Sequence, residues 1–398
     1  MTMKKNKTIE DFEKVIGECV KCGVCQAHCP AYEVERKEGA VARGKISLAA
    51  AFLHGETGLE SRLQEDMSMC LMCGSCVKKC PNKVPTHEIV GAIRREITNN
   101  EGLGLVGKSV SHLLASKPLM AGLSKTGALF SPLLLKKVPQ SSGLRLRFPT
   151  PVMKDRTLPK MSFRSLFDRV EEYIEGHHSK PVVGFFAGCS ISYIYPEIGE
   201  QMVRVLKGMG CSVFLPRSQK CCGIPAISAG NGNLVEELAA ANIQAFAARK
   251  VDHVVTACGS CNGGIGEYYS SMKDGDDTFT DKVVDFSVFL KKQGLFQELR
   301  EMEKWSHRTK VTYHDPCHLK TQAITKEPRE LLQSLPNIDF VEMEGADRCC
   351  GLGGTFSVYH YGSSRAIGEK KIPGLRESGA AKIATACPGC IISLDDGG

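Results

Sequence analysis

The sequence predicts a multidomain α+β protein, in which a helical N-terminal domain is followed by two tandem α/β domains related by internal duplication. Three observations predict this. The first 100 residues carry two cysteine runs separated by a helical pattern. From Pro181 onward, short apolar strands alternate with helical segments. The cysteines of this later part form two five-member sets, offset by 128 residues for the first three members and 129 for the last two.

Cysteine usage indicates the class of chemistry. The chain has 19 cysteines in 398 residues, and its first residues are charged and lack the apolar segment of a secretory signal. A protein that is not exported stays in a reducing compartment, where clustered cysteines bind metal more often than they form disulfides. We therefore expect a cytoplasmic metal-binding protein. Eighteen cysteines fall into four spaced sets; Cys211 does not, and we expect it to be a buried structural thiol.

Charge and hydropathy weigh against two classes of partner. No segment approaches the roughly 20 uninterrupted apolar residues that a membrane-spanning helix needs. The net charge of +7 is modest and is compatible with an acidic partner or an anionic membrane surface. No recognised nucleic-acid-binding motif accompanies it. We expect no nucleic-acid partner and, at most, peripheral association with the inner face of a membrane.

Residues 1–100 carry two runs of the form C-x2-C-x2-C-x3-C-P, which is typical of bacterial ferredoxins. In that pattern the fourth cysteine of each run ligates the other cluster. The runs therefore predict two [4Fe-4S] cubanes, the first held by Cys19, Cys22, Cys25 and Cys80, and the second by Cys70, Cys73, Cys76 and Cys29. Zinc is the alternative, although four-thiolate zinc sites usually pair two separated C-x2-C knuckles. Helical patterns over residues 40–55 and 86–98 predict a helical domain rather than a small β-ferredoxin.

Residues 101–180 are predicted to be a basic linker or docking segment. Residues 101–160 contain ten Lys or Arg and two acidic residues, and small apolar clusters alternate with Gly, Ser and Pro. One interpretation is a helical linker with solvated lysines. The other is a docking strip for a partner subunit or a membrane surface. The sequence leaves both open.

The two α/β domains, residues 181–305 and 306–398, each carry a lone cysteine, an adjacent cysteine pair and a C-x-x-C. The first set is Cys189, Cys221, Cys222, Cys258 and Cys261; the second set is Cys317, Cys349, Cys350, Cys387 and Cys390. Adjacent cysteines rarely bridge to each other, but their thiolates can bind different atoms of one cluster. The lone cysteine and the C-x-x-C follow predicted strands at 182–187, 251–257, 310–313 and 382–386. Since ligand sites gather at the carboxyl ends of such strands, each set should converge on one rim.

Other elements of the duplication are also predicted from pattern. Strands are expected over residues 212–215 and 339–343, and helices over residues 196–207, 234–249 and 328–335 and after Ser363. The pieces around the two C-x-x-C motifs are near copies, Thr256-Ala257-Cys258-Gly259-Ser260-Cys261 and Thr385-Ala386-Cys387-Pro388-Gly389-Cys390. The second half therefore repeats the first, element by element.

The repeated Cys-Cys-Gly motif, at Cys221-Cys222-Gly223 and Cys349-Cys350-Gly351, resembles the CCG (cysteine-rich) domain of heterodisulfide reductases and related iron–sulfur subunits. Over essentially the whole chain, the arrangement looks like the iron–sulfur subunits of glycolate or D-lactate oxidoreductases, of heterodisulfide reductase and of anaerobic glycerol-3-phosphate dehydrogenase. Ala42-Arg43-Gly44-Lys45-Ile46 is similar to the glycolate/lactate branch. The resemblance implies a non-cubane [4Fe-4S] cluster in one or both five-cysteine sets, or zinc in one of them. Relatives usually continue further beyond the last cysteine, so the final strand or helix of the second copy is expected to be short or missing.

The resemblance also implies a function. Oxidising a hydroxyacid removes two electrons, whereas iron–sulfur clusters pass them singly, and a flavin bridges this mismatch. The chain has no G-x-G-x-x-G after a strand, and the look-alike at Gly351-Leu352-Gly353-Gly354 follows a cysteine pair, so we expect no flavin or nucleotide site. We expect an electron-transfer subunit that passes electrons from an FAD-containing 2-hydroxyacid (glycolate or D-lactate) dehydrogenase subunit, through cubane and CCG-bound clusters, to a quinone or other carrier.

Two alternatives stay open. The chain could be an enzyme in its own right that reduces a disulfide at a CCG-bound cluster, as heterodisulfide reductase does. It could instead be a zinc-stapled scaffold, although four separate cluster motifs argue against this. The candidate catalytic residues are His314, Asp315 and His318, which flank Cys317. They are expected to hydrogen-bond cluster sulfurs or backbone, or else to deliver protons at a catalytic cluster.

Overall fold

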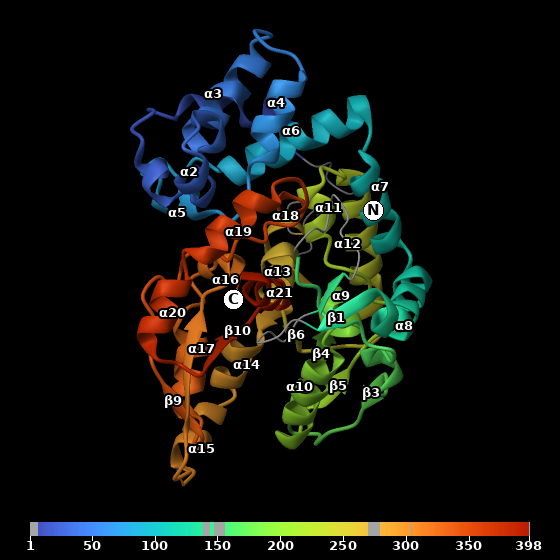
Figure 1. Ribbon diagram of the computed structural model, residues 1–398. Coiled ribbons are helices and arrows are strands. Elements are labelled where there is room, and N and C mark those ends of the chain that lie inside the picture. The colour runs from blue at the N-terminus through green and yellow to red at the C-terminus, as the bar shows by residue number, and fades with distance from the viewer. Residues whose placement is uncertain (1–6, 138–143, 147–155, 270–278, 304, 398) are drawn as a thin grey trace.

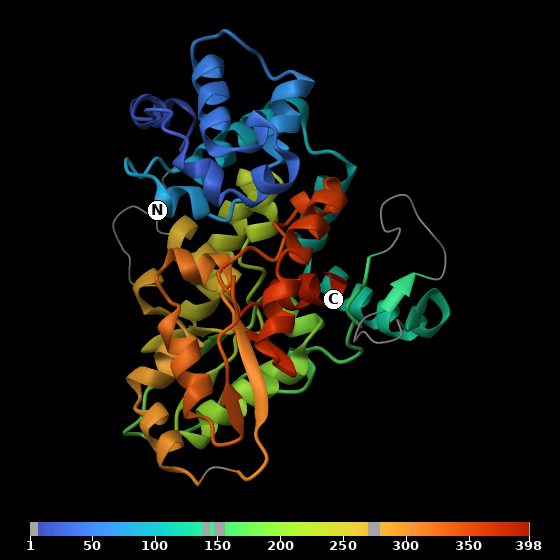
Figure 2. The same cartoon turned by 60° about the vertical axis from the view of Figure 1, so that its left-hand side comes forward.

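The computed structural model describes residues 7–137, 144–146, 156–269, 279–303 and 305–397. A helical N-terminal domain lies at one end, over two α/β domains placed side by side (Figure 1). A helical arm connects the N-terminal domain to the first α/β domain in the sequence. It runs along the first α/β domain and projects from it in Figure 2. This is the predicted α+β arrangement.

The N-terminal domain contains helices and no strand within residues 7–101, as expected for a helical rather than a β-ferredoxin domain. Apolar residues spaced along the two predicted helices, including Ile46, Ile89 and Ile93, form its core. Pro30 is the first residue of a helix, and Cys29 is its N-cap. The Cys29 sulfur accepts a hydrogen bond from the Tyr32 N–H at 3.5 Å. Its helices are α1 (Glu13–Gly17), α2 (Pro30–Glu35), α3 (Ala42–Leu53), α4 (Ser61–Ser68), α5 (Ser75–Lys79) and α6 (Thr86–Glu101), with 3₁₀ turns η1 (Glu10–Phe12), η2 (Val24–His28) and η3 (Glu38–Ala40).

The arm consists mainly of two helices. Helix α8 begins at Lys117, with Pro118 in its first turn and the Ser116 hydroxyl accepting a hydrogen bond from the Leu119 N–H at 3.4 Å. A two-stranded antiparallel hairpin follows it. The elements are α7 (Leu105–Ala115), α8 (Lys117–Leu134), β1 (Leu135–Lys137), β2 (Leu144–Leu146) and η4 (Leu166–Asp168). No helix in the described parts of the chain is long and apolar enough to cross a membrane.

The first α/β domain is built on a five-stranded sheet with the order β3-β5-β4-β6-β7. Strands β5, β4, β6 and β7 are parallel, and β3 is an antiparallel edge strand. Because β3 (Tyr173–Ile174) lies before Pro181, the sheet includes part of the segment predicted to be a linker. The other elements are β4 (Val182–Phe186), α9 (Gly188–Tyr193), α10 (Pro196–Gly208), β5 (Ser212–Phe214), α11 (Ile224–Ser228), α12 (Gly232–Ala247), β6 (His253–Thr256), α13 (Gly259–Gly264), η5 (Ile265–Tyr269), η7 (Thr280–Lys282), β7 (Val283–Asp285), α14 (Phe286–Lys292) and α15 (Leu295–Glu301).

The second α/β domain repeats the first with a smaller, fully parallel sheet in the order β10-β8-β9. The register is repeated as well: Phe186 lies opposite Thr256 in the first sheet, and His314 lies opposite Thr385 in the second. Where the first copy has β7, the described second copy has no further strand and continues as α21. Its elements are β8 (Thr309–His314), α16 (Cys317–Thr321), α17 (Lys326–Ser334), β9 (Ile338–Phe340), α18 (Phe356–Tyr359), α19 (Tyr361–Glu369), α20 (Ile372–Ser378), β10 (Lys382–Thr385) and α21 (Pro388–Gly397).

The three domains meet at Ser228, at the end of α11. The buried Arg94 guanidinium of α6 donates to the Ser228 carbonyl at 3.0 Å. The Ser228 hydroxyl lies 2.8 Å from that of Thr355 in the second α/β domain. Nearby, Gly230 has a φ of +78°, and a Cβ there would lie 2.4 Å from the Arg94 carbonyl oxygen. The N-terminal domain is therefore fitted closely onto both α/β domains.

Candidate metal centres

All nineteen cysteines are free thiols, and eighteen of them line three cavities. The exception is Cys211, which is 1% exposed and packs in the apolar core of the first α/β domain. The structure thus places the leftover cysteine in a core, as predicted. The other thiols are gathered from residues far apart in the sequence.

The first cavity, of about 440 Å³, lies in the N-terminal domain and contains Cys19, Cys22, Cys25 and Cys80, with Cys76 also in its wall. The backbone on either side of Cys22 turns sharply, since Lys21 has a φ of +54° and Gly23 a φ of +84°. The structure therefore brings together the four cysteines assigned by spacing to the first cubane.

The second cavity, of about 380 Å³, contains Cys29, Cys70, Cys73 and Cys76, the group assigned to the second cubane. The same turn recurs around Cys73, where Met72 and Gly74 have φ angles of +55° and +67°. Burial raises the pKa of Cys29 to about 11 and that of Cys76 to about 12. These thiols would stay protonated near neutral pH unless a metal displaced the proton.

Two buried cations lie against this second cavity. Lys45 is 2% exposed, and its ammonium donates to the Gly39 carbonyl at 2.6 Å and to the carbonyl of Asp66. Arg94 is 7% exposed and donates to the carbonyls of Met67 and Cys70 at 2.7 and 2.8 Å. Neither pairs with a carboxylate in the described part of the chain. A buried charge without a counter-ion is costly, so both cations fit a site that carries a thiolate-bound anionic cluster.

The third cavity is the largest, at about 1110 Å³ including its solvent-open part, and it contains the thiols of both five-cysteine sets together with Cys73. The lone cysteines and the C-x-x-C motifs lie just beyond the ends of β4, β6, β8 and β10, so each set lies at the carboxyl rim of its sheet, as predicted. The two rims face each other, and Cys258 Sγ of the first set lies 3.9 Å from Cys387 Sγ of the second. Nothing in the cysteine spacing indicated this contact between sets.

Sulfur spacing in this cavity fits metal ligation. Cys189 and Cys221 lie 3.7 Å apart at Sγ, and Cys350 and Cys390 lie 3.6 Å apart. Two thiolates on one tetrahedral metal, each bonded at about 2.3 Å, are separated by about 3.8 Å. Both sets therefore contain sulfurs close enough to bind one metal, a spacing that Cys258 and Cys387 also have across the two sets. The many soft sulfur donors fit iron–sulfur clusters or zinc.

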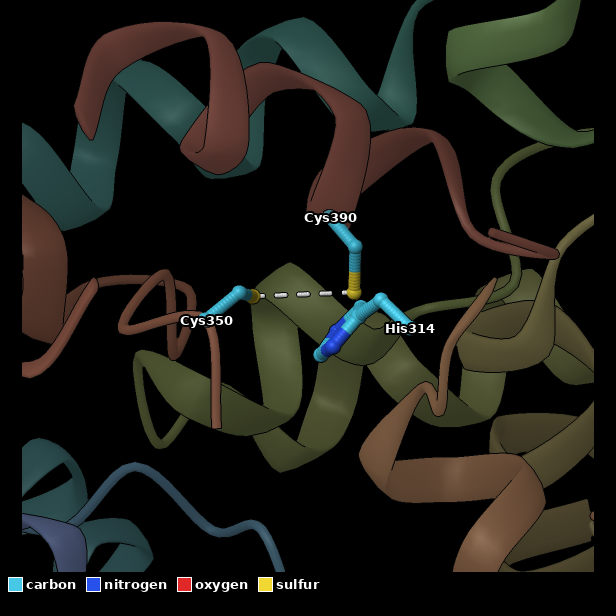
Figure 3. A group of neighbouring side chains, drawn as sticks. All are labelled: His314, Cys350 and Cys390. Atoms are coloured by element: carbon cyan, nitrogen blue, oxygen red, sulfur yellow. Dashed lines mark hydrogen bonds between the residues drawn. The ribbon is translucent and has the colours of Figure 1, made fainter. Parts of the chain in front are cut away.

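His314 lies directly beside the second set. It ends β8, is fully buried, and has no hydrogen-bond partner at either ring nitrogen among the described residues. Figure 3 shows the imidazole beside the facing sulfurs of Cys350 and Cys390, and the three ligand atoms lie within 4.8 Å of one another. The three side chains come from a strand, a loop and a helix. A buried imidazole in this position is suited to interact with whatever the thiols bind.

The other two candidate catalytic residues have different surroundings. Asp315 is buried, and both of its carboxylate oxygens accept hydrogen bonds from Arg329, at 2.7 and 2.8 Å. This fork geometry gives Asp315 a structural ion pair, so it is poorly suited to proton transfer. His318 lies on the cavity wall beside Cys317. Of the three, His318 lines the cavity, His314 lies beside two of the cavity's sulfurs, and Asp315 is held in its ion pair.

Two buried lysines beside the second set were not predicted from the sequence. Lys320 donates to the Asp347 carbonyl at 2.7 Å. Lys371 donates to the carbonyls of Gly345, Ala346 and Arg348 at 2.7 to 3.1 Å. Burial lowers the pKa of Lys371 to about 8, while the charges of the four nearest thiols act in the opposite direction. Aligning the two copies residue by residue would have revealed both lysines, because the first copy has neutral residues at those positions.

The comparisons with known proteins agree with this arrangement. The family model described as "Cysteine-rich domain" matches twice, at residues 183–266 and 311–395. The model described as "4Fe-4S dicluster domain" matches residues 16–84. The matched segments contain all eighteen clustered cysteines and leave the arm unmatched. They follow the order of domains predicted from the sequence.

Relatives match over almost the full chain. A probable glycolate oxidase iron-sulfur subunit from Bacillus subtilis is 30% identical, covering 99% of this chain and 93% of the relative. An anaerobic glycerol-3-phosphate dehydrogenase subunit from Escherichia coli is 27% identical, covering 94% and 92%. One subunit of the dihydromethanophenazine:CoB–CoM heterodisulfide reductase from Methanosarcina barkeri is 26% identical, covering 95% and 88%. All three branches of the resemblance are represented.

Proposed function

Because the chain belongs to the family of iron–sulfur proteins that join a 4Fe-4S dicluster domain to two CCG domains, we propose that it is the electron-transfer subunit of a flavin-dependent 2-hydroxyacid dehydrogenase complex. It receives electrons from an FAD-containing subunit that oxidises glycolate or D-lactate, and it delivers them to a quinone or another carrier. The similarity to a probable glycolate oxidase iron-sulfur subunit over nearly the whole of both chains supports this substrate class.

The observation that carries the proposal is the gathering of eighteen thiols into three adjoining cavities of one molecule. Iron–sulfur clusters, when bound, accept and release single electrons. Cys73 lines both the second cavity and the large one, so the N-terminal domain and the CCG domains are joined through thiols. The absence of a dinucleotide-binding glycine motif after a strand supports placing the flavin in a partner.

We assign the thiols to four centres. The assignment comprises two [4Fe-4S] cubanes and a non-cubane [4Fe-4S] cluster in each CCG set, with zinc in one CCG set as the alternative. The groups are Cys19, Cys22, Cys25 and Cys80; Cys70, Cys73, Cys76 and Cys29; the first set; and the second set. Anaerobic iron, sulfide and zinc analysis tests this, since about sixteen irons means four loaded sites and about eight means cubanes only.

The surface of the arm supports the proposal that the electron acceptor is a lipid-soluble molecule such as a quinone. Helix α8 turns its small and polar side toward the protein, where the buried Ser124 hydroxyl donates to the Tyr193 carbonyl at 3.1 Å. Its opposite side exposes an apolar stripe formed by Leu119, Leu123, Leu129, Phe130 and Leu133. Four of these lie on one helical face, because 119, 123, 130 and 133 repeat with the helical period.

The charge of the sequence segment that contains this stripe favours an anionic lipid surface over a protein. Between Glu101 and Asp155 the chain has eight Lys or Arg and no acidic residue. Exposed apolar side chains within a basic segment are typical of helices that lie in the membrane interface. We infer that α8 rests on the membrane and keeps the nearby first CCG set close to a lipid-soluble acceptor.

The decisive functional experiment mixes the iron-loaded chain with an FAD-containing glycolate or D-lactate dehydrogenase and the hydroxyacid, under anaerobic conditions. Electron paramagnetic resonance should show the chain becoming reduced, and omission of the flavoprotein should leave it oxidised. A Cys76→Ser variant, which lacks one thiol of the second cavity, should be reduced with fewer electrons per chain. A chain that stays oxidised with both hydroxyacids contradicts the proposal.

A second candidate function, reduction of a disulfide as in heterodisulfide reductase, is favoured by one observation. The two CCG sets share a single open cavity, which offers room beside both sets at once. Turnover of a disulfide by the isolated chain with a reduced dye would support this candidate. The two assays use different electron donors, so they separate the two functions.

A further inference from the structure

The two CCG sets have the same backbone frame but different charges around them. Phe186 and His314 each end the strand before the lone cysteine, and each lies opposite the equivalent threonine, Thr256 or Thr385. The two copies can therefore be compared position by position, with an offset of 128 residues early in the repeat and 129 late in it. Three buried positions near the thiols differ in the same sense.

The first position is Phe186 in one copy and His314 in the other. Phe186 is fully buried and stacks on Phe246, with ring centroids 5.8 Å apart. His314 is equally buried, but it places an imidazole without a hydrogen-bond partner in the described structure within 4.8 Å of the Cys350 and Cys390 sulfurs. An N–H donor is thus available to the second set where the first has a hydrocarbon ring.

The second position is Ser192 or Lys320, each on the short helix that carries the lone cysteine. Ser192 is 1% exposed and neutral. Lys320 is 9% exposed and donates to the Asp347 carbonyl at 2.7 Å. The Asp347 carboxylate is 4.0 Å away and its side chain is 70% exposed, so it neutralises this lysine only weakly.

The third position is Asn242 or Lys371, each of which holds the loop leading into the adjacent cysteine pair. The Asn242 amide donates to the Cys221 carbonyl at 3.0 Å and accepts from the Lys220 N–H at 2.7 Å. The Lys371 ammonium holds the equivalent loop by a contact one residue earlier, donating to the Arg348 carbonyl at 2.8 Å. The same loop is therefore fixed by a neutral amide in one copy and by a buried cation in the other.

Charges elsewhere near the two sets do not cancel this difference. The first set has two partly buried cations, Lys117 and Lys220, which share a small cavity with Cys189 and Cys221. The second set has one additional buried anion, Asp315, but Arg329 pairs with both of its oxygens. Two buried lysines and an imidazole beside the second set thus compare with two partly buried lysines beside the first, whose charges solvent screens more strongly.

We propose that His314, Lys320 and Lys371 raise the reduction potential of the centre held by the second CCG set above that of the centre held by the first. This rests on the proposed iron–sulfur loading of both sets. Adding an electron makes a centre more negative, and nearby cations and N–H donors stabilise the more negative form. Net charge and hydrogen bonds to sulfur are among the factors that set cluster potentials. When the two CCG centres together hold one electron, that electron therefore resides at the centre of the second set.

The test is a redox titration of the full-length, anaerobically loaded chain, followed by electron paramagnetic resonance. Three variants give the second set the residue of the first: His314→Phe, Lys320→Ser and Lys371→Asn. His314→Phe and Lys371→Asn should each shift one CCG midpoint to lower potential and leave the two cubanes and the other CCG centre unmoved. Lys320→Ser should lower the same CCG midpoint and, to a smaller extent, that of the second cubane, because Lys320 also donates at 3.5 Å to the Ser75 hydroxyl, which lies 3.5 Å from the Cys73 sulfur. Matched controls keep the donor or the charge, and His314→Gln and Lys371→Arg should retain most of the wild-type potential.

A reciprocal variant tests the same idea from the other side. Asn242→Lys introduces the second copy's cation beside the first set, and it should raise the lower of the two CCG midpoints. Asn242 is fully buried, so iron content and circular dichroism of this variant check that it folds and loads like the wild-type chain.

Several outcomes would overturn the inference. Swap variants with unchanged midpoints and full iron content would show that these residues do not set the potential. Equal shifts of all centres would indicate a global change rather than a local field. Iron analysis separates this failure from that of the proposed loading: about eight irons per chain, or zinc in one CCG set, removes the premise before any titration.

Discussion

Gly223 and Gly351 follow the two adjacent cysteine pairs and share a φ of +94°, but their neighbours differ. A Cβ at position 351 would lie 2.1 Å from the Ser364 carbonyl oxygen, which belongs to helix α19. A Cβ at position 223 would find its nearest neighbour at 3.7 Å, on the Val235 side chain. Both glycines are needed for conformation, and only Gly351 is also needed for space.

Alanine substitutions should separate these two effects. A left-handed backbone costs a non-glycine residue about 1–2 kcal/mol, which Gly223→Ala and Gly351→Ala share. Gly351→Ala should cost more, because the helix backbone must move away from the new methyl group. Anaerobic urea unfolding of the loaded chain, followed by circular dichroism, measures the difference. Equal losses in the two variants would refute the role of the Ser364 contact.

At the residue scale, the sequence identified the thiols but not the cations around them. Spacing alone grouped the N-terminal cysteines, because in the C-x2-C-x2-C-x3-C-P run the first three cysteines ligate one cluster and the fourth ligates the other. Lys45 and Arg94 produced no such signal, since a buried lysine and a solvated one look alike in a sequence. Their burial depends on packing between α3, α4 and α6, and for Arg94 also on the carbonyl of Ser228 in the first CCG domain.

At the scale of a single element, the prediction is that helix α8 binds anionic membranes. If its apolar stripe rests on lipid, the chain should sediment with vesicles of anionic phospholipid, and about 0.5 M salt should weaken the binding by screening. The double variant Leu123→Glu, Phe130→Glu should weaken vesicle binding at least about tenfold, because burying each of these two apolar side chains contributes on the order of 1.5–3 kcal/mol.

The matched control for α8 is Val205→Glu, which places the same charge at an exposed apolar position on α10. This variant should bind vesicles like the wild-type chain. If the wild-type chain itself ignores anionic vesicles, the membrane assignment is wrong. The stripe would then be the docking face for the dehydrogenase subunit, the other role that the basic segment suggested.

Most elements of the two CCG domains could be predicted from periodicity. The predicted strands at 182–187 and 382–386 appear as β4 (Val182–Phe186) and β10 (Lys382–Thr385), because buried strands of parallel sheets read as apolar runs. Strand β3 was missed, since two residues are too few to show alternation. The β1–β2 hairpin was missed because its strands are three residues each.

Contacts between domains are the part of the fold that local pattern could not supply. The sequence predicted two separate CCG sites, whereas the structure opens both onto one cavity and brings Cys258 within 3.9 Å of Cys387, 129 residues later. Such contacts depend on how whole domains pack, and no periodic signal in the chain encodes that packing. The same is true of Ser228, where all three domains meet.

One domain contact should depend on pH. His87 of α6 bonds through Nε2 to Glu267 of the first CCG domain. Burial lowers the pKa of His87, but the hydrogen bond and the charge of Glu267 outweigh it, so its pKa is raised. The unfolded or undocked histidine titrates at its ordinary value, so the pair stabilises docking below that value and loses this effect as the pH rises through the raised pKa.

The N-terminal domain should therefore dock less tightly at about pH 9 than at about pH 6. Hydrogen exchange of the α6 amides at the two pH values, corrected for the intrinsic rate, measures the change. His87→Gln keeps a polar side chain but cannot be charged, and it should remove the pH dependence. A wild-type chain whose corrected protection does not change with pH would show that this pair does not contribute to docking.

The shared cavity has a consequence for biosynthesis. Its wall takes Cys73 from the N-terminal domain and Cys390 from α21, so no partial chain on the ribosome can complete it. On the proposed loading, iron and sulfide for the second CCG set are delivered only after translation has passed Cys390. On that loading, a cell short of iron is expected to accumulate the full-length chain with its second CCG set unloaded.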